Sequence, residues 1–168
     1  MAADNPWAQV KIYSSSFLFV FFFAAIASVG SAKAPDIYSS LLLPNWAPNP
    51  SLFGPVWACL YFSIAISLGI FRGRSNWRMH PLIATLFVAQ LFLNAAWSWF
   101  FFFDENVLLA LWDITILNVL VLVLVLVLLL LLFRRGFKIC TFLLLPYFCW
   151  IFFALLLTNS IWLNNPTV

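Results

Sequence analysis

The residues best suited to chemistry in this sequence are uncharged polar and aromatic side chains within strongly apolar segments. The stretch QLFLNAAWSWFF has the helical spacing i, i+4, i+7 and i+11, which places on one face Gln90, Asn94, Trp97 and Phe101. Amides hydrogen-bond a neighbouring helix or a ligand, while aromatic rings stack on flat apolar molecules. This face predicts either contacts between helices or one wall of a ligand cavity. Trp97 and Trp99 are also candidates for anchors at the membrane interface.

Two other apolar segments carry side chains of the same kind. In LLALWDITILN, Asp113 lies inside an apolar run, where a carboxylate needs a partner or water. Its carboxylate either reaches the membrane interface or has a function, in which it ties a loop or tunes the pocket. Near the C-terminus, Trp150, Ala154 and Leu157 share one helix face. The small residue either permits close helix packing or leaves room for a flat ligand.

Residues for acid–base, nucleophilic or metal chemistry are scarce. The single histidine, His80, has no partner at ligand spacing, and the three cysteines, Cys59, Cys140 and Cys149, are isolated in apolar surroundings. No nucleophile–base pair and no metal-binding spacing is present, so we predict no catalytic residues for hydrolysis or group transfer and no metal site.

The elements that position these residues must be membrane helices. Only 8% of the 168 residues are charged and the mean hydropathy is +1.07, whereas soluble domains have roughly 25% charged residues. A helix that crosses the hydrocarbon core needs about 20 apolar residues. The chain is therefore predicted to be one all-α integral membrane domain, 1–168, with five spans at about 12–32, 52–71, 81–102, 107–133 and 139–163.

Two stretches differ from the rest in regularity. The run VLVLVLVLVLLLLLF at 119–133 is uniformly apolar, and we interpret it as the lipid-facing half of the fourth helix. Between the first two spans, Pro44, Pro48 and Pro50 prevent a regular helix. Irregular backbone cannot face lipid, so this loop must lie at the membrane surface or fold over another part of the chain.

The charges predict an orientation in the membrane. Seven basic residues fall in the N-terminal tail and in the second and fourth connections: Lys11, Arg72, Arg74, Arg78, Arg134, Arg135 and Lys138. The other side has only Lys33, beside Asp36, Asp104 and Glu105. The positive-inside rule therefore places the N-terminus in the cytoplasm and the first loop on the opposite side. The basic residues set this topology or contact anionic lipids, and they do not suggest a nucleic-acid partner. Bacterial and organellar membranes both fit.

Three stretches together resemble a known family, that of the translocator proteins, also called peripheral benzodiazepine receptors or tryptophan-rich sensory proteins (TspO/MBR). They are LPNWAPNPSLFGPVWACLYF, QLFLNAAWSWFFF and LPYFCWIFFALLLTNSIWLNN, and the resemblance covers nearly the whole chain, from Tyr38 to Asn165. It implies a bundle of five transmembrane helices whose long first loop caps a ligand cavity. The prolines and Trp46 would then form a lid, and Gly54–Pro55 would start the second helix.

The resemblance also implies the residues around the ligand. Carried over position by position, they are Ala27, Gly30, Trp46, Phe53, Gly54, Val56, Trp57, Asn94, Trp97, Leu109, Trp112, Ile116, Trp150, Ala154 and Leu157. Three positions depart from the family pattern: Asn49 and Ser51 in the lid, and Leu109 in the wall formed by the fourth helix. The last helix lacks the tyrosine and basic residue of the proposed cholesterol motif, which favours a tetrapyrrole over a sterol.

The function implied by this resemblance is a membrane receptor or sensor for hydrophobic ligands. Porphyrin or haem, sterols and synthetic isoquinoline or benzodiazepine ligands are the expected occupants, with no obligatory cofactor, and the family is often homodimeric. Reported family members also promote light-dependent breakdown of bound porphyrin, which makes an enzyme the first alternative. A sterol or porphyrin transporter is another, although inverted repeats are not visible. The last alternative is an assembly scaffold without a ligand, in which the aromatic faces only pack against each other.

Overall fold

The computed structural model describes residues 5–74, 80–132 and 138–165, in which every regular element is a helix. Five stretches are long and apolar enough to cross a membrane: Pro6–Gly30, Pro50–Arg74, Pro81–Phe103, Val107–Leu130 and Lys138–Asn164. The elements are α1 (Pro6–Gly30), α2 (Ala34–Ser40), η1 (Pro50–Leu52), α3 (Phe53–Arg74), α4 (Pro81–Ser98), η3 (Trp99–Phe103), α5 (Val107–Leu132) and α6 (Lys138–Asn164). The prediction of an all-helical protein with five spans is confirmed.

The first helix begins earlier than the hydropathy pattern predicts. Pro6 occupies the first turn, where its missing N–H costs no hydrogen bond, and the side chain of Asn5 accepts the N–H of Trp7 at 3.0 Å. The first turns also carry the polar residues Gln9 and Lys11, so a count of apolar residues alone predicts a start near residue 12. The first residue of α1 is thus determined by its N-terminal cap as well as by its apolar run.

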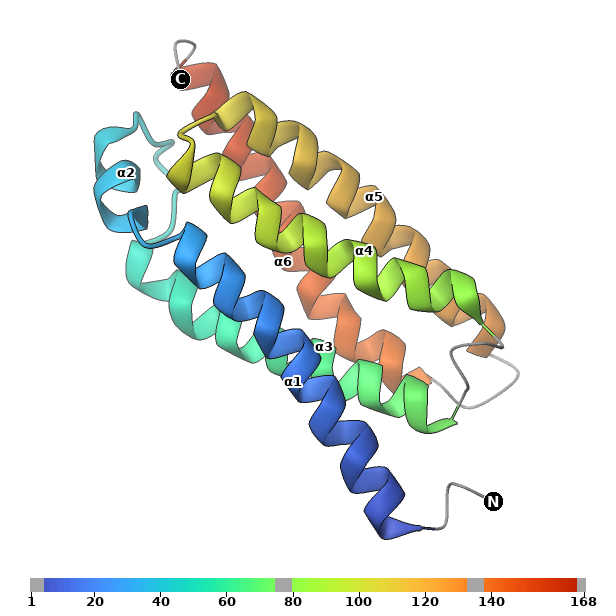
Figure 1. Cartoon of the computed structure of the whole chain (residues 1–168). Helices are drawn as coiled ribbons and strands as arrows, with labels where there is room; N and C mark the ends of the chain where they lie inside the picture. Colours follow the sequence, from blue (N-terminus) through green and yellow to red (C-terminus); the bar gives the residue numbers. More distant parts are fainter. Residues whose placement is uncertain (1–4, 75–79, 133–137, 166–168) are drawn as a thin grey trace.

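The five long helices form a closed ring. Helix α1 packs against α3 and α4, α4 packs against α5, α5 packs against α6, and α6 returns to α3 (Figure 1). Helix α2 and residues 41–49, together called the lid here, lie at the end of the ring where α6 finishes (Figure 1). The N-terminal end of α1 is at the opposite end. Any cavity enclosed by the ring near the end of α6 is therefore covered by the lid.

A π-helical turn, η3, continues α4. The N–H of Asp104 donates to the carbonyl of Trp99 at 2.9 Å, a five-residue separation in place of the four of an α-helix. Such turns change which side chains face a neighbouring element and often occur at functional sites. Here two successive side chains, Phe101 and Phe102, are both buried. Trp99 instead faces α1, where its Nε1 donates to the carbonyl of Ile26 at 3.0 Å.

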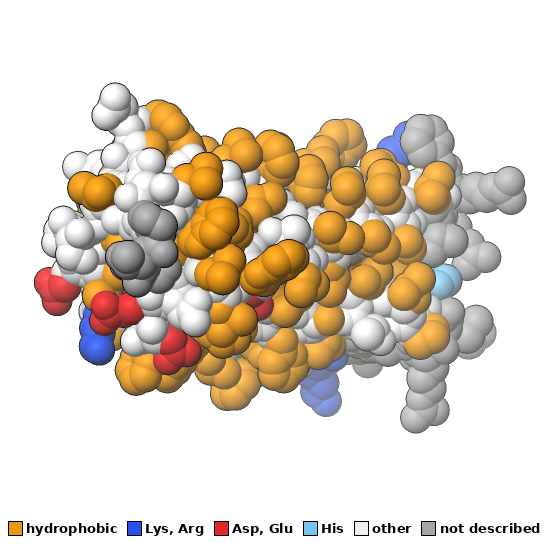
Figure 2. Space-filling view, turned by 90° about the horizontal axis from the view of Figure 1, so that it is seen from above, with side chains coloured by type: hydrophobic (Ala, Val, Ile, Leu, Met, Phe, Trp, Pro, Cys, Tyr) orange, Lys and Arg blue, Asp and Glu red, His pale blue; other side chains and the backbone are white. Residues whose placement is uncertain are grey.

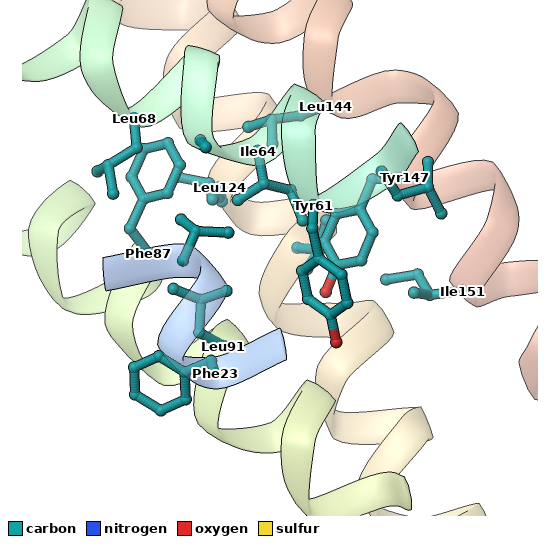
Figure 3. Packing of buried hydrophobic residues seen from close by; sticks show 14 of the residues in the cluster. Phe23, Tyr61, Ile64, Leu68, Phe87, Leu91, Leu124, Leu144, Tyr147 and Ile151 are labelled. Atoms are coloured by element: carbon teal, nitrogen blue, oxygen red, sulfur yellow. The ribbon is translucent and has the colours of Figure 1, made fainter. Parts of the chain in front are cut away.

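The interior of the ring holds one large core of side chains from all five long helices (Figure 3). Leu124 belongs to this core with only 1% of its surface exposed, and Val121 and Leu128 on the same helix are also buried. The interpretation of 119–133 as lipid-facing is therefore wrong for one face of α5. That face is covered because α4 and α6 both pack against it.

Charged side chains are sorted between the two ends of the bundle. Acidic side chains gather at one end and hydrophobic side chains cover the middle (Figure 2). Asp36 is in α2, and Asp104 and Glu105 follow η3 at the end near the lid, whereas Arg72 and Arg74 end α3. Arg78, Arg134 and Arg135, which contribute to the predicted orientation, lie outside the described residues. The fold is that of a multi-pass membrane protein with chemically different ends.

Candidate ligand cavity

A small closed cavity lies in the half of the ring beneath the lid. Its volume is about 20 Å³, enough for about one water molecule. Side chains of α2, α3, α4, η3 and α6 enclose it: Tyr38, Phe53, Trp57, Trp97, Phe101, Phe102, Trp150, Ala154, Leu157, Thr158 and Ile161. Aromatic rings dominate this wall, so the cavity is small because the rings fill it.

The rings make mostly perpendicular contacts with each other. Trp57 and Trp150 have ring centroids 6.5 Å apart at 89°, and Phe53 meets Trp150 at 6.1 Å and 71°. On the opposite wall, Trp97 stacks on Phe101 at 5.0 Å and 29°. These geometries are favourable for aromatic pairs. They also leave several ring faces and edges directed at one enclosed space.

The lid forms the roof through Tyr38 and the proline-rich stretch. The Tyr38 hydroxyl donates to the carbonyl of Pro48 at 3.1 Å, and its ring meets Phe53 at 5.5 Å. Burial raises the pKa of the Tyr38 hydroxyl above its usual value of 10.0. Trp46 extends over the bundle and contacts Phe153 at 5.7 Å and 69°. The lid is therefore packed on α3 and α6.

Hydrogen bonds from the end of α6 to the backbone of one residue, Leu42, hold the lid. Asn165 accepts the N–H of Leu42 at 3.0 Å through Oδ1 and donates to the Leu42 carbonyl at 3.2 Å through Nδ2. Asn164 donates to the same carbonyl at 3.3 Å. A single side-chain amide thus satisfies both polar groups of Leu42, much as a neighbouring strand would. We call these three bonds the latch.

A buried polar network lies next to the aromatic wall. The Tyr61 hydroxyl donates to Asn94 Oδ1 at 2.5 Å, and the Tyr147 hydroxyl donates to Gln90 Oε1 at 2.8 Å and accepts from Asn94 Nδ2 at 3.4 Å. The rings of Tyr61 and Tyr147 point into the bundle interior (Figure 3). Both amides thus connect helices, as the first interpretation of their helix face predicts, and Asn94 is not in the cavity wall. Tyrosines inside apolar segments need such partners, a signal that sequence reasoning overlooked.

Several buried polar atoms have no hydrogen-bond partner in the described part of the chain. Two of them, Trp97 Nε1 and Trp150 Nε1, belong to the cavity wall. A third is Oδ2 of Asp113, whose side chain is only 6% exposed. Asp113 therefore does not extend to the membrane interface but is enclosed by the bundle. Unpartnered buried groups are uncommon, and each one is a candidate for contact with water or a ligand.

The structure brings six of the residues implied by the family resemblance into the cavity wall: Phe53, Trp57, Trp97, Trp150, Ala154 and Leu157. The others lie elsewhere. Ala27 is in the helix core, Val56 packs against that core, Gly54 is exposed, and Trp46 covers the lid side of α6. Gly30 is covered by Trp99, whose Cδ1 would be 2.7 Å from an added Cβ.

The fourth-helix residues are not part of the cavity. Leu109, Trp112 and Ile116 are exposed on the outer face of α5, with Trp112 63% exposed. The buried face of that part of α5 carries Ala110 and Ile114 instead. The positions of α5 that the resemblance implies therefore lie outside this cavity, at the segment where the sequence already departs from the family pattern.

Other lining residues were not selected from the sequence. Thr158 and Ile161 continue the face of Ala154 and Leu157 at helical spacing, so periodicity could have identified them. Phe102 faces the cavity only because of the π-helical turn, for which the sequence WFFFF gives no signal. Tyr38 lies in α2, a short helix that the sequence analysis did not predict.

Comparisons with known proteins agree with the fold. Residues 16–163 match the sequence model of the TspO/MBR family. The tryptophan-rich protein TspO of Chlorobaculum tepidum is 34% identical over 148 residues, which cover 84% of this chain and 90% of that protein. Its namesake in Archaeoglobus fulgidus is 37% identical over 128 residues, covering 76% and 79%. The human translocator protein is 25% identical over 130 residues, covering 76% and 74%.

Proposed function

Because the chain belongs to the TspO/MBR family, we propose that it is a membrane receptor or sensor that binds a porphyrin-type tetrapyrrole beneath its lid. The single observation that carries this proposal is the closed aromatic cavity in the helix bundle. Ligand sites are typically concave and mostly apolar, with a few polar groups that fix orientation. Tryptophan and phenylalanine faces offer stacking surface to a flat macrocycle. Porphyrin or haem is then a ligand and not an obligatory cofactor.

Binding of so large a molecule requires the cavity to open. A site for a drug-sized ligand has a volume of roughly 300–1,000 Å³, compared with about 20 Å³ in the closed state. The lid is the segment best suited to move, because it is short and, among the residues that the structure describes, only the latch joins it to α6 by hydrogen bonds, while its other contacts are the aromatic edges and apolar side chains that pack on the cluster beneath it. We expect bound tetrapyrrole to replace the contacts that Tyr38 and Trp46 make in the closed state.

The proposal is tested by titrating the purified protein with protoporphyrin IX in the dark. Quenching of tryptophan fluorescence and a shift of the porphyrin absorption band should both saturate at one ligand per chain. The variant Trp7→Phe, which changes an exposed residue at the far end of α1, is the matched control. If the wild-type protein gives only the weak, non-saturating signal of empty detergent micelles, the proposal is wrong.

Light-dependent breakdown of the bound porphyrin is the second candidate function. It is favoured by the neighbouring indole rings of Trp57 and Trp150, which have centroids 6.5 Å apart in the cavity wall. A photoexcited macrocycle can take one electron from a neighbouring indole, which becomes a radical cation, and the reduced macrocycle then reacts with dioxygen, the oxidant whose oxygen atoms are incorporated as the ring opens. Illuminating the complex in air and under argon separates the functions: loss of porphyrin absorption that needs both light and Trp150 indicates an enzyme, and a stable complex indicates a receptor.

Family membership also supports further proposals about partners and placement. We propose that the protein forms a homodimer in the bilayer, and that sterols and synthetic isoquinoline or benzodiazepine ligands compete for the same cavity. We also propose a cytoplasmic N-terminus with the lid on the opposite side of the membrane, as the distribution of basic residues indicates. Crosslinking in native membranes at low protein density tests the dimer, and displacement of porphyrin tests the shared cavity.

A further inference from the structure

The polar groups of the cavity wall are mainly hydrogen-bond donors. Nε1 of Trp97 and Nε1 of Trp150 are buried and have no hydrogen-bond partner within the described residues, yet both side chains line the same cavity. Trp97 comes from α4 and Trp150 from α6, helices that are not neighbours in the ring. A buried donor without an acceptor is costly, so two of them at one cavity need an explanation.

None of the described oxygens in this region accepts a hydrogen bond from either indole. The oxygens of Asn94 and Gln90 accept from Tyr61 and Tyr147, and the Tyr38 hydroxyl donates its hydrogen to the Pro48 carbonyl. The remaining polar side chain of the wall, Thr158, has a hydroxyl that can donate as well as accept. The cavity therefore has unsatisfied donors and offers few acceptors. Its polar groups favour a ligand that carries a hydrogen-bond acceptor, in addition to the flat shape that the rings favour.

The present neighbours of the two indoles are aromatic rings. Trp97 lies perpendicular to Phe102 at 5.7 Å and 86°, and Trp150 lies perpendicular to Trp57 at 6.5 Å and 89°. An N–H directed at a ring is a second-order interaction compared with a bond to oxygen. A ligand oxygen that reaches either donor would therefore offer a stronger interaction than the neighbouring rings can.

We propose that the indole N–H groups of Trp97 and Trp150 bind an acceptor oxygen of the ligand and so determine which tetrapyrroles the protein accepts. The inference rests on the proposed function and names the ligand chemistry of that site. The oxygen can belong to a carbonyl or to a carboxylate. No lysine or arginine is among the residues that line the cavity, and burying an unpaired carboxylate is costly. A neutral carbonyl oxygen is therefore the preferred group.

Three probes of similar size separate these chemistries. Protoporphyrin IX dimethyl ester presents neutral carbonyl oxygens, protoporphyrin IX presents carboxylates, and etioporphyrin has alkyl substituents without oxygen. Wild-type protein in nanodiscs should bind the dimethyl ester more tightly than the diacid. It should bind etioporphyrin roughly tenfold more weakly than the dimethyl ester, because etioporphyrin leaves both donors unpaired.

The variants Trp97→Phe and Trp150→Phe remove one donor each. Each should weaken dimethyl ester binding about tenfold while changing etioporphyrin binding less than about threefold, since etioporphyrin makes no bond to the donors. Trp7→Phe, the same substitution at an exposed position far from the cavity, is the control. Trp97→3-benzothienylalanine keeps the ring size and replaces N–H by sulfur, so it should reproduce the selective loss even if phenylalanine disturbs packing.

Each alternative result has a defined meaning. Equal losses for dimethyl ester and etioporphyrin in the variants would show that the indoles act only as packing surface, and would overturn this inference while leaving the proposed function intact. Tighter binding of the diacid than of the ester would overturn the preference for a neutral carbonyl. If the wild-type protein binds none of the three porphyrins, the proposed function fails and this inference fails with it.

Discussion

Trp97 and Trp150 present aromatic surfaces to the cavity from two helices that do not neighbour each other in the ring. Stacking of an aromatic side chain on a flat base contributes about 1–3 kcal/mol by alanine substitution, and a macrocycle offers a similar surface. Trp97→Ala and Trp150→Ala should therefore each weaken protoporphyrin binding roughly tenfold or more, since about 1.4 kcal/mol is a factor of ten. Equilibrium titration in the dark measures this.

The control for these variants is Trp112→Ala. Trp112 is implied by the family resemblance but is 63% exposed on the outer face of α5. Its removal should leave porphyrin affinity within about twofold of the wild-type value, a difference below about 0.5 kcal/mol. A large loss for Trp112→Ala together with normal affinity for Trp97→Ala and Trp150→Ala would move the binding site to the outer face of α5.

Gly30 illustrates a position where only the smallest residue fits. An added Cβ would lie 2.7 Å from Cδ1 of Trp99, and that indole is held by its bond to the Ile26 carbonyl. Gly30→Ala should therefore lower the free energy of unfolding by about 1–3 kcal/mol through overpacking. Thermal unfolding in detergent measures the change. Gly54→Ala is the matched control, because nothing lies within 4 Å of its added Cβ. Similar destabilisation by both would contradict this explanation.

At the scale of elements, the buried face of a helix could be predicted only where polar residues mark that face. Gln90 and Asn94 identify the inner face of α4 because an amide in an apolar segment must point to a partner. In α5 the run of valine and leucine has no polar marker, so Leu124 could not be assigned to the core from sequence. The π-helical turn likewise depends on tertiary packing, which is why Phe102 was not identified.

The lid is the element whose stability should control ligand exchange. Asn165 makes two hydrogen bonds to the Leu42 peptide, and each net bond contributes about 0.5–1.5 kcal/mol. Asn165→Ala should therefore speed both entry and release of porphyrin about tenfold, with a smaller change in equilibrium affinity, because the latch is present only in the closed lid. Stopped-flow fluorescence after mixing and after competitor addition gives the two rates.

Asn159→Ala provides the matched comparison for the latch. Asn159 lies on α6, the helix that ends directly before Asn165, and its side chain is exposed on the outside of the bundle. Its substitution should leave both rates unchanged. If Asn165→Ala also leaves both rates unchanged, the latch does not limit lid opening, and entry between the long helices becomes the better explanation for how a ligand reaches the cavity.

For the molecule as a whole, the number of spans followed from hydropathy, but the arrangement of the helices did not. A membrane helix must satisfy its backbone internally, so a long apolar segment identifies a span with little dependence on context. The order of the ring, in which α3 and α4 are not adjacent along it although they follow each other in the chain, depends on which side chains interdigitate. For that reason helical spacing could only propose the faces of α4 and α6 that carry Trp97 and Trp150 as a possible cavity wall, and the cavity residues of α3 were predicted through the family resemblance alone.

The predicted orientation in the membrane rests on the charge distribution of the whole molecule. Seven of the eight basic residues belong to the tail and connections on one predicted side, and only Lys33 belongs to the other.

In a background with Cys59→Ala, Cys140→Ala and Cys149→Ala, Ser39→Cys in α2 should react with a membrane-impermeant maleimide from outside intact cells. Ser75→Cys, which lies outside the described residues, should react only after permeabilisation. Reaction of Ser75→Cys in intact cells and protection of Ser39→Cys would reverse the orientation. Equal reaction of both from outside would contradict the single span, α3, that separates Ser39 from Ser75.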